Sequence, residues 1–183
     1  LCTACQVPLG GKPNPLAKPL PPAVPGIGFL VTFYSTVYRE HDDARSRYFV
    51  HLSLFMFSML GIVLADNFVM MFIFWELVGL SSYLLIGHWF TRDAAGKAAN
   101  KAFIMNRLGD FGFMLGILML WATAGTVTFD GLVENQVALA QNPLFLGAAV
   151  LLIFCGAIGK SAQFPLHPWL PDAMEGPTPV SAL

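Results

Sequence analysis

The chain has 183 residues, a net charge of −1, and a composition that is 56% hydrophobic and only 11% charged. Soluble domains carry about 25% charged residues, so this chain has too few charges to cover a water-soluble globule. The near-zero net charge also argues against a nucleic-acid partner, because phosphate binding requires a concentration of Lys and Arg.

Residues 1–29 are predicted to form an irregular, Pro-rich and disordered lead-in, because seven of the thirteen prolines fall within residues 1–25. This stretch lacks the charged start and apolar run of a signal peptide. Cys2 and Cys5 have the C-x-x-C spacing, but a closed zinc site needs four ligands. Two free thiols are therefore favoured over a metal or redox site. The chain starts at Leu1 rather than Met and is interpreted as a fragment.

The rest of the chain, residues 30–183, is predicted to be part of an all-α, polytopic transmembrane helix bundle. A bilayer crossing takes about 20 helical residues, and about four apolar stretches approach that length: residues 48–65, 68–90, 102–121 and 144–164. They are apolar on every side, which indicates burial in lipid or protein, and a backbone in hydrocarbon must be helical. Residues 26–38 form a shorter apolar stretch, below the crossing length. A large soluble core is the alternative.

The loops of this predicted bundle alternate in charge. The basic residues Arg39, Arg45, Arg47, Arg92, Lys97 and Lys101 fall before the first span or between the second and third. The turn at residues 66–67 and the loop at 122–142 contain no Lys or Arg. The positive-inside rule therefore places the basic loops on the cytoplasmic side or its organellar equivalent.

Glu76 is the clearest charge inside a span, because seven apolar residues precede it and neither surface is within reach of its side chain. A charge at the bilayer centre costs about 2.5–3.5 kcal/mol. A titrating carboxyl group is the functional interpretation, and a static ion pair between helices is the alternative.

Lys160 lies near the end of the fourth span, where a lysine stem can also reach the interface. Pro165 follows closely and predicts that this fourth span is discontinuous, and broken helices inside membrane proteins line cavities. After Pro165 and its neighbours the chain is expected to begin a further helix. His167, in the same Pro-rich segment, is kept as a candidate proton relay because of the near-neutral pKa of histidine.

Arg107 and Asp110 are three residues apart and share one helix face near the start of the third span. They either neutralise each other as an ion pair or bias the titrating groups. If Glu76 and Lys160 approach each other, a change in their separation changes both pKa values. A pKa change of about three corresponds to about 4 kcal/mol, which is also the work of moving one charge through about 180 mV. Varying this separation could therefore drive one proton against a membrane potential.

Several stretches resemble one family, the antiporter-like membrane subunits of proton-translocating NADH:quinone oxidoreductase (complex I, chain L or subunit 5 type). They are residues 64–68, 75–76, 78–87 and 106–111, and above all the run 159–183, which begins Gly159-Lys160-Ser161-Ala162-Gln163-Phe164-Pro165. The resemblance covers about residues 45–183. It implies a proton channel in which Glu76 is the channel glutamate and Lys160 the channel lysine on a discontinuous helix. Asp110 and its neighbour Arg107 would belong to the same half-channel.

The resemblance also implies the setting of the chain. It would be an integral subunit in the bilayer of a bacterial inner membrane or an organellar inner membrane, beside other complex I membrane-arm subunits. It would carry no redox centre of its own, while NADH, FMN, iron–sulfur clusters and quinone bind in partner subunits. The alternatives are a subunit of a multisubunit cation/proton antiporter or of a membrane-bound hydrogenase, which share the acid and the lysine, and a purely structural anchor or gene remnant.

Overall fold

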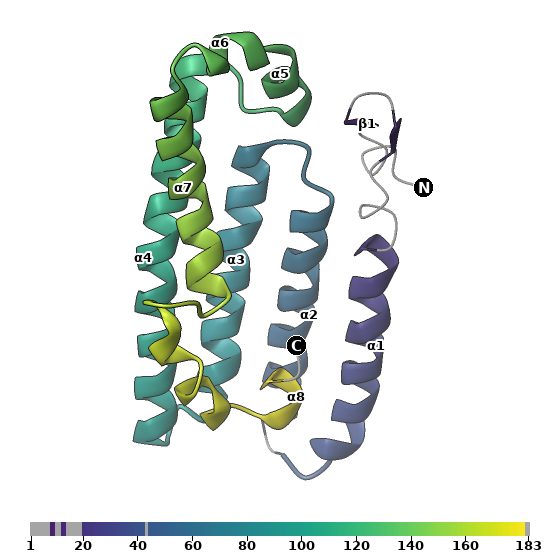
Figure 1. The fold of residues 1–183 in the computed structure, drawn as a ribbon. Helices are drawn as coiled ribbons and strands as arrows, with labels where there is room; N and C mark the ends of the chain where they lie inside the picture. The colour runs from purple at the N-terminus through teal and green to yellow at the C-terminus, as the bar shows by residue number, and fades with distance from the viewer. Residues whose placement is uncertain (1–7, 10–11, 14–19, 43, 182–183) are drawn as a thin grey trace.

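The chain forms an all-α bundle of long helices that run along one another, as the sequence predicts (Figure 1). The computed structural model describes residues 8–9, 12–13, 20–42 and 44–181. Within that part, four helices are long and apolar enough to cross a membrane. They are α2 (Arg45–Val63), α3 (Phe68–Ile86, continued by the 3₁₀ helix η2, Gly87–Trp89), α4 (Asp93–Ala124) and α7 (Pro143–Lys160).

The remaining elements are short or lie at the edge of the bundle. They are an antiparallel pair of two-residue strands, β1 (Pro8–Leu9) and β2 (Lys12–Pro13), and the helices α1 (Leu20–Tyr38), α5 (Phe129–Glu134), α6 (Gln136–Ala140), η3 (His167–Trp169), η4 (Asp172–Glu175) and α8 (Thr178–Ser181). The last of these short helices, α8, lies where a further helix is expected to begin after the Pro-rich segment.

Helix α1 corrects the predicted lead-in, because the helix begins at Leu20 and includes the last ten residues assigned to residues 1–29. Pro21 and Pro22 occupy its first turn, where backbone N–H groups have no partner within a helix and proline is tolerated. Residues 1–7, 10–11 and 14–19 lie outside the described part of the chain. The prediction of disorder there, and the two thiols of Cys2 and Cys5, fall in these residues.

Helix α4 is longer than the predicted span of residues 102–121, because it begins at Asp93 and ends at Ala124. Ala95, Ala98, Ala99 and Ala102 are buried on one face of its first three turns. Alanine is the strongest helix former, so this segment is helical although it is less apolar than the rest. The helix ends where Gly125 adopts a φ of 69°, a left-handed conformation that favours glycine.

The predicted break in the fourth span is confirmed, but it lies four residues earlier than expected. Helix α7 ends at Lys160, and Ala162 then adopts a φ of 48°. Pro165 cannot donate a backbone hydrogen bond and restricts the residue before it, so the helix cannot continue. Figure 1 shows that α7 stops partway along α4, and that η3, η4 and α8 occupy the remaining length of the bundle.

Glycines let α4 and α7 approach each other closely. A Cβ added at Gly116 would lie 2.7 Å from the Ala149 carbonyl oxygen, and one at Gly109 would lie 2.8 Å from the Cys155 carbonyl oxygen. Gly159 of α7 lies directly opposite Gly109. Small residues at such positions are typical of helix packing in membranes, where close backbone contact replaces the hydrophobic driving force.

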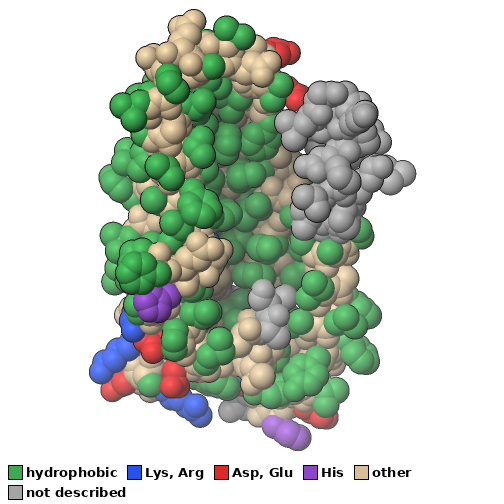
Figure 2. Space-filling model, in the orientation of Figure 1, with side chains coloured by type: hydrophobic (Ala, Val, Ile, Leu, Met, Phe, Trp, Pro, Cys, Tyr) green, Lys and Arg blue, Asp and Glu red, His purple; other side chains and the backbone are tan. Residues whose placement is uncertain are grey.

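Charged side chains gather at one end of the bundle, where α1 and α3 end and α2 and α4 begin; this end is called the basic end below. Figure 2 shows hydrophobic side chains along the flank of the molecule and Lys and Arg at the basic end. Large apolar residues on the outside, such as Leu144, Leu151 and Leu108, are exposed because lipid is their solvent. The chain is therefore an integral membrane protein segment.

Candidate functional site

Glu76 and Arg107 form an ion pair between α3 and α4, in the middle of α3. The Glu76 side chain is 22% exposed in the isolated chain. The Arg107 guanidinium also lies over the Phe103 ring, 4.4 Å from its centroid. A charged pair is much cheaper to place in hydrocarbon than a lone charge, so Arg107 is what allows Glu76 to lie at this depth.

This arrangement contradicts one of the two expectations for Arg107, the ion pair with Asp110; the other, that Arg107 biases the titrating groups, stays a prediction. Within the described residues Arg107 makes no ion pair with Asp110, so the two do not neutralise each other on their shared helix face. Glu76 in turn has Arg107, rather than Lys160, as its partner. The physical reason is geometry: the Glu76 carboxylate on α3 faces the helix that carries Arg107, whereas Lys160 lies one turn further along α3.

Trp75 links Asp110 to the site. The indole Nε1–H of Trp75 donates a 2.7 Å hydrogen bond to Asp110 Oδ1. Asp110 is almost completely buried, and its second oxygen, Oδ2, has no hydrogen-bond partner among the described residues. A buried carboxyl oxygen without a partner is costly, so this atom is ready to accept a water, a proton or a cation.

Lys160 points into the bundle rather than toward the interface. Its Nζ lies so close to α3 that a Cβ added at Gly79 would be 2.8 Å away. The same Nζ lies over the Trp75 ring, 5.9 Å from its centroid. Within the described part of the chain Lys160 has no ion-pair partner. The absence of a side chain at Gly79 and the face of Trp75 therefore make the space that the ammonium occupies.

A cavity of about 330 Å³ lies beside Lys160. Its lining is mostly apolar and comes from α2, α3 and the segment after α7. The polar groups are Lys160 at the end of α7, Asn106 of α4, Ser82 and Ser181. Asn106 is buried and its Oδ1 has no partner in the described residues. The volume is large enough for several waters, and water needs polar groups of this kind to bind to. The cavity therefore leaves space and polar groups beside the Lys160 side chain.

His167 lies away from these groups. It is exposed in η3, where its ring stacks on Phe164 at a centroid distance of 6.0 Å. The hydrogen bond that ties this segment to the site comes instead from Trp169, whose Nε1–H donates to the Gly159 carbonyl oxygen at 3.0 Å. Among the residues that the structure describes, no group of His, Cys, Asp and Glu could hold a metal ion.

Three residues of the site were missed by the sequence analysis: Trp75, Gly79 and Asn106. A signal existed for the first, because a tryptophan in mid-span must find an acceptor for its N–H and here it directly precedes the mid-span Glu76. Gly79 follows Glu76 by three residues and so shares its helix face. Nothing in the sequence distinguishes Asn106 from a packing residue.

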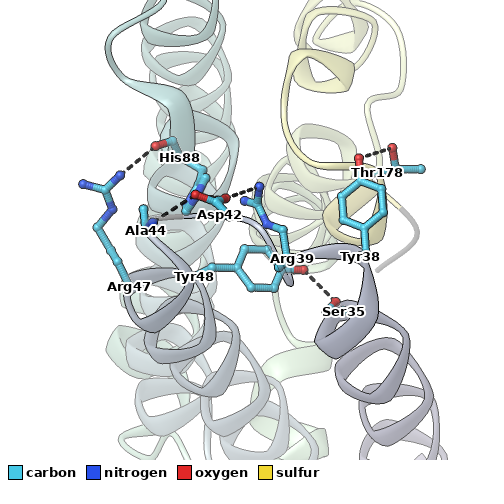
Figure 3. A network of polar contacts seen from close by, with 9 residues as sticks. All are labelled: Ser35, Tyr38, Arg39, Asp42, Ala44, Arg47, Tyr48, His88 and Thr178. Atoms are coloured by element: carbon cyan, nitrogen blue, oxygen red, sulfur yellow. Dashed lines mark hydrogen bonds and ion pairs between the residues drawn. The ribbon is translucent and has the colours of Figure 1, made fainter.

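A second buried polar network lies at the basic end, where the loop after α1 meets α2 and η2 (Figure 3). Arg39 is only 3% exposed, pairs with Asp42 and lies over the rings of Tyr48 and Trp89, 4.6 and 5.0 Å from their centroids. His88 Nε2 lies 3.3 Å from Asp42 Oδ2. This histidine is therefore a hydrogen-bonded anchor rather than a free relay.

Asp42 is the centre of the network. Burial by itself would raise the pKa of this carboxyl group, but three neighbours outweigh it: the Ala44 backbone N–H, the Arg39 guanidinium and the His88 ring. Together they hold the pKa of Asp42 below its ordinary value. The network thereby fixes α1 to the start of α2, with a further hydrogen bond of 3.1 Å between Ser35 and Tyr48 hydroxyls.

Comparison with known proteins places this site in a wider context. A family model described as NADH:quinone oxidoreductase/Mrp antiporter, TM, matches residues 65–183, which include Glu76, Arg107, Asp110 and Lys160 but not Arg39 or Asp42. The NAD(P)H-quinone oxidoreductase subunit 5, chloroplastic, of Glycine max is 53% identical over 161 residues, covering 86% of this chain and 22% of that protein. The protein of the same name from Zygnema circumcarinatum is 50% identical over 183 residues, covering 96% and 26%.

Two solved structures share the fold. The structure of the Mrp complex from Dietzia sp. DQ12-45-1b contains a chain with a TM-score of 0.84 and 34% identity, covering 93% of this chain and 18% of that one. The membrane-bound sulfane sulfur reductase, an archaeal respiratory membrane complex, matches with a TM-score of 0.73 at 22% identity, covering 85% and 32%. The chain spans about a quarter of the length of the curated relatives it matches.

Proposed function

Since the chain belongs to the NADH:quinone oxidoreductase/Mrp antiporter transmembrane family, we propose that it contains a proton-translocating half-channel of a quinone oxidoreductase membrane arm. The observation that carries the proposal is the position of Lys160 inside the bundle. Its ammonium group lies against Gly79 and Trp75 and beside a cavity, and it has no carboxylate partner within 4.0 Å in the described residues. Intramembrane ionisable residues mark ion pathways.

Proton transfer in this proposal depends on an exchange of ion-pair partners. Arg107 of α4 pairs with Glu76 of α3. Asp110 lies one turn after Arg107 on α4, and its Oδ2 has no partner among the described residues. If Arg107 moves from Glu76 to Asp110, Glu76 loses its counter-charge. It then attracts either Lys160 or a proton, because an uncompensated carboxylate in hydrocarbon is strongly unfavourable.

Lys160 completes the cycle by binding and releasing a proton at Nζ. The cavity beside it supplies water on the side of η3, η4 and α8. When Lys160 approaches Glu76 the ammonium form is stabilised, and when the two separate the proton can leave. A pKa change of about three corresponds to about 4 kcal/mol, enough to move one charge through about 180 mV.

The proposed setting is a multisubunit membrane complex, in which neighbouring membrane-arm subunits carry the rest of the pathway. NADH, FMN, iron–sulfur clusters and quinone are assigned to those partner subunits. The chloroplast relatives favour an organellar membrane over a bacterial inner membrane for this chain. A cation/proton antiporter subunit is the second candidate, supported by the Mrp complex, which is 34% identical. The 50–53% identity to quinone oxidoreductase subunits favours the first.

The proposal is tested by replacing Glu76 and Lys160 in the complete complex, reconstituted in vesicles with a pH-sensitive dye inside. Glu76→Gln and Lys160→Met are each expected to lower proton translocation about 100-fold, because removal of a proton-transferring group costs about 10²–10⁴-fold. Glu134→Gln and Lys101→Met are matched controls in which exposed residues change, and translocation should remain near the wild-type rate.

Unaltered translocation in Glu76→Gln would remove the proton-channel assignment and leave a structural anchor. The antiporter alternative is separated by co-purification: NADH dehydrogenase subunits should accompany the protein. Sodium-dependent proton exchange in their absence would support the second candidate instead.

A further inference from the structure

A second cavity, of about 330 Å³, opens at the basic end of the bundle, and it shares no lining residue with the cavity beside Lys160. It lies between the first turns of α2, the end of α3 with η2, and the start of α4. Arg47 and His51 reach it from one face of α2, one turn apart, and His88 lines it from η2. The catalytic proposal above makes no use of these groups.

The polar groups around this cavity have hydrogen-bonding capacity to spare. Arg47 donates to the His88 carbonyl oxygen at 3.0 Å, which Figure 3 shows, and this is one of the five N–H groups of its guanidinium. The His88 side chain is 0% exposed; its Nε2 is used by Asp42, while its Nδ1 has no partner in the described residues. His51 Nδ1 is likewise buried without a partner there.

The charge of the lining is one-sided. Arg47 is cationic, and none of the lining residues is acidic. Asp42 lies nearby, but it is held by Arg39, by the Ala44 backbone N–H and by the Nε2 side of the His88 ring. With Nε2–H donating to Asp42, the neutral His88 ring presents Nδ1 as an acceptor. The cavity therefore offers a guanidinium for an anion, whereas the buried His88 Nδ1 is out of reach of a ligand.

The remaining lining residues are apolar or aromatic. Leu84 and Tyr83 come from α3, and Phe90, which is 64% exposed, packs under the Arg47 guanidinium at 4.8 Å from its ring centroid. A phosphate bound by Arg47 would thus lie at the end of membrane-spanning helices, with apolar surface leading along the bundle from it. Basic pockets between transmembrane helices on the basic side are suited to lipid headgroups.

We infer that this cavity binds the headgroup of an anionic phospholipid, with phosphatidylglycerol as the probe. Arg47 binds the phosphate oxygens, and the apolar lining beside it contacts the lipid. His51 Nδ1 and His88 Nδ1 are buried and make no contact with the headgroup. Because the lining comes from several helices, the bound lipid ties the start of α2 to the end of α3.

The inference is tested by native mass spectrometry of the complete protein released from detergent, titrated with phosphatidylglycerol and, separately, with phosphatidylcholine. Phosphatidylglycerol is expected to bind at least about fivefold more tightly, since one basic residue near a membrane surface is worth about 1 kcal/mol toward an anionic lipid. Arg47→Gln should lower the affinity for phosphatidylglycerol about five- to tenfold. Arg47→Lys, which keeps the charge, should retain part of the affinity and covers the case in which Arg47→Gln does not fold.

Arg45→Gln is the matched control, because Arg45 lies two residues away on the same helix, is exposed and does not line the cavity. It should change the affinity by less than about twofold. Equal losses in Arg45→Gln and Arg47→Gln would indicate a general surface charge and overturn the inference, as would equal binding of the two lipids. Displacement of phosphatidylglycerol by millimolar inorganic phosphate would identify a site for free phosphate and overturn the assignment to a lipid.

Discussion

The two charge clusters of this bundle differ in how many partners each charge has. At the basic end Asp42 binds Arg39, His88 and a backbone N–H at once, and Arg39 is enclosed between two aromatic rings. In mid-span Glu76, Asp110 and Lys160 have one partner each. Glu76 pairs with Arg107, Asp110 accepts a hydrogen bond from the Trp75 indole N–H, and Lys160 lies over the Trp75 ring.

The difference lies in how easily each cluster rearranges. Moving Asp42 breaks several interactions together, so that network has one stable arrangement. Moving Arg107 breaks its ion pair with Glu76 and its contact with Phe103, but Arg107 can then pair with Asp110 Oδ2, which has no partner among the described residues. Lys160 can likewise leave the face of Trp75 for the cavity beside it. Partly satisfied polar groups are unfavourable for stability, and their presence in mid-span is consistent with a site that must exchange partners.

Apart from the loss of Glu76 or Lys160 themselves, the largest effect is expected from Gly79→Ala. The added Cβ would lie 2.8 Å from Lys160 Nζ, and since this is the end of a flexible side chain, the ammonium moves and the helix stays. We expect proton translocation by the complete complex to fall about 10- to 100-fold, because misplacing a reacting group by about 1 Å costs about that much. Thermal unfolding should be nearly unchanged.

Gly147→Ala is the control for this substitution, because a Cβ at Gly147 meets nothing within 4 Å. Both changes replace glycine by alanine in a helix, so their intrinsic effects on helix stability are alike. If both variants translocate protons at the same rate, Gly79 does not define the position of Lys160.

Asp42→Asn should test the rigid cluster. Arg39, 3% exposed, would lose its carboxylate, and breaking a buried pair costs about 3–5 kcal/mol. Because the Asp42 side chain is 19% exposed, we expect a smaller loss of about 2–3 kcal/mol in the free energy of unfolding, measured by denaturant titration in detergent. Asp130→Asn, an exposed acid at the opposite end of the bundle, should change it little.

The same substitution has a predicted pH dependence. The pKa of Asp42 lies below its ordinary value of 3.8 in the folded chain, so its contribution is complete above that value and disappears as the pH falls through the lower folded pKa. The stabilities of wild type and Asp42→Asn should therefore converge as the pH is lowered below 3.8. A difference that stays constant down to the acid transition would show that charge is not the cause.

Gly116→Ala should destabilise the contact between α4 and α7 without touching either charge cluster. The added Cβ would lie 2.7 Å from the Ala149 carbonyl oxygen and 2.8 Å from the Ile153 amide nitrogen, and backbone atoms cannot rotate away. Overpacking of this kind costs about 1–3 kcal/mol. Denaturant titration should show that loss relative to Gly147→Ala, and translocation per folded complex should be retained.

The smallest effect is expected from Lys101→Ala, which removes an ion pair of 2.7 Å with Asp172. Both side chains are more than 40% exposed, and exposed pairs contribute about 0–1 kcal/mol. Unfolding measured at low and high salt should show a small difference that salt abolishes. A loss larger than that of Asp42→Asn would contradict the smaller contribution expected of this exposed pair.

The sequence was enough to predict the bundle, because a long apolar segment in a membrane must satisfy its own backbone hydrogen bonds and therefore forms a helix. The break after Lys160 was also predictable from Pro165. The helical start of α4 was not, because Lys97 and Lys101 resemble loop residues there, while the buried alanines on the other face are what make it a helix. The composition of a segment is an average over all faces of a helix, whereas packing depends only on the face that is buried.

The site was predictable as a set of residues but not as a set of pairs. A charge in an apolar run identifies Glu76 or Lys160, whereas the choice of partner depends on how α3 and α4 are rotated about their axes. That rotation is fixed by tertiary contacts, such as the glycine contacts of α4 with α7. The pairing of Glu76 with Arg107, and the bridge made by Trp75, are therefore visible only in three dimensions.

The early end of α7 has an electrical consequence for Lys160. The carboxyl end of a helix carries about half a negative charge from its unpaired carbonyl groups, and Lys160 is the last residue of this helix. Most spanning helices place that partial charge at the membrane surface, where water screens it, but here the helix stops inside the bundle. The peptide dipole of α7 thus acts as a fixed counter-charge for the lysine, one that cannot be titrated away.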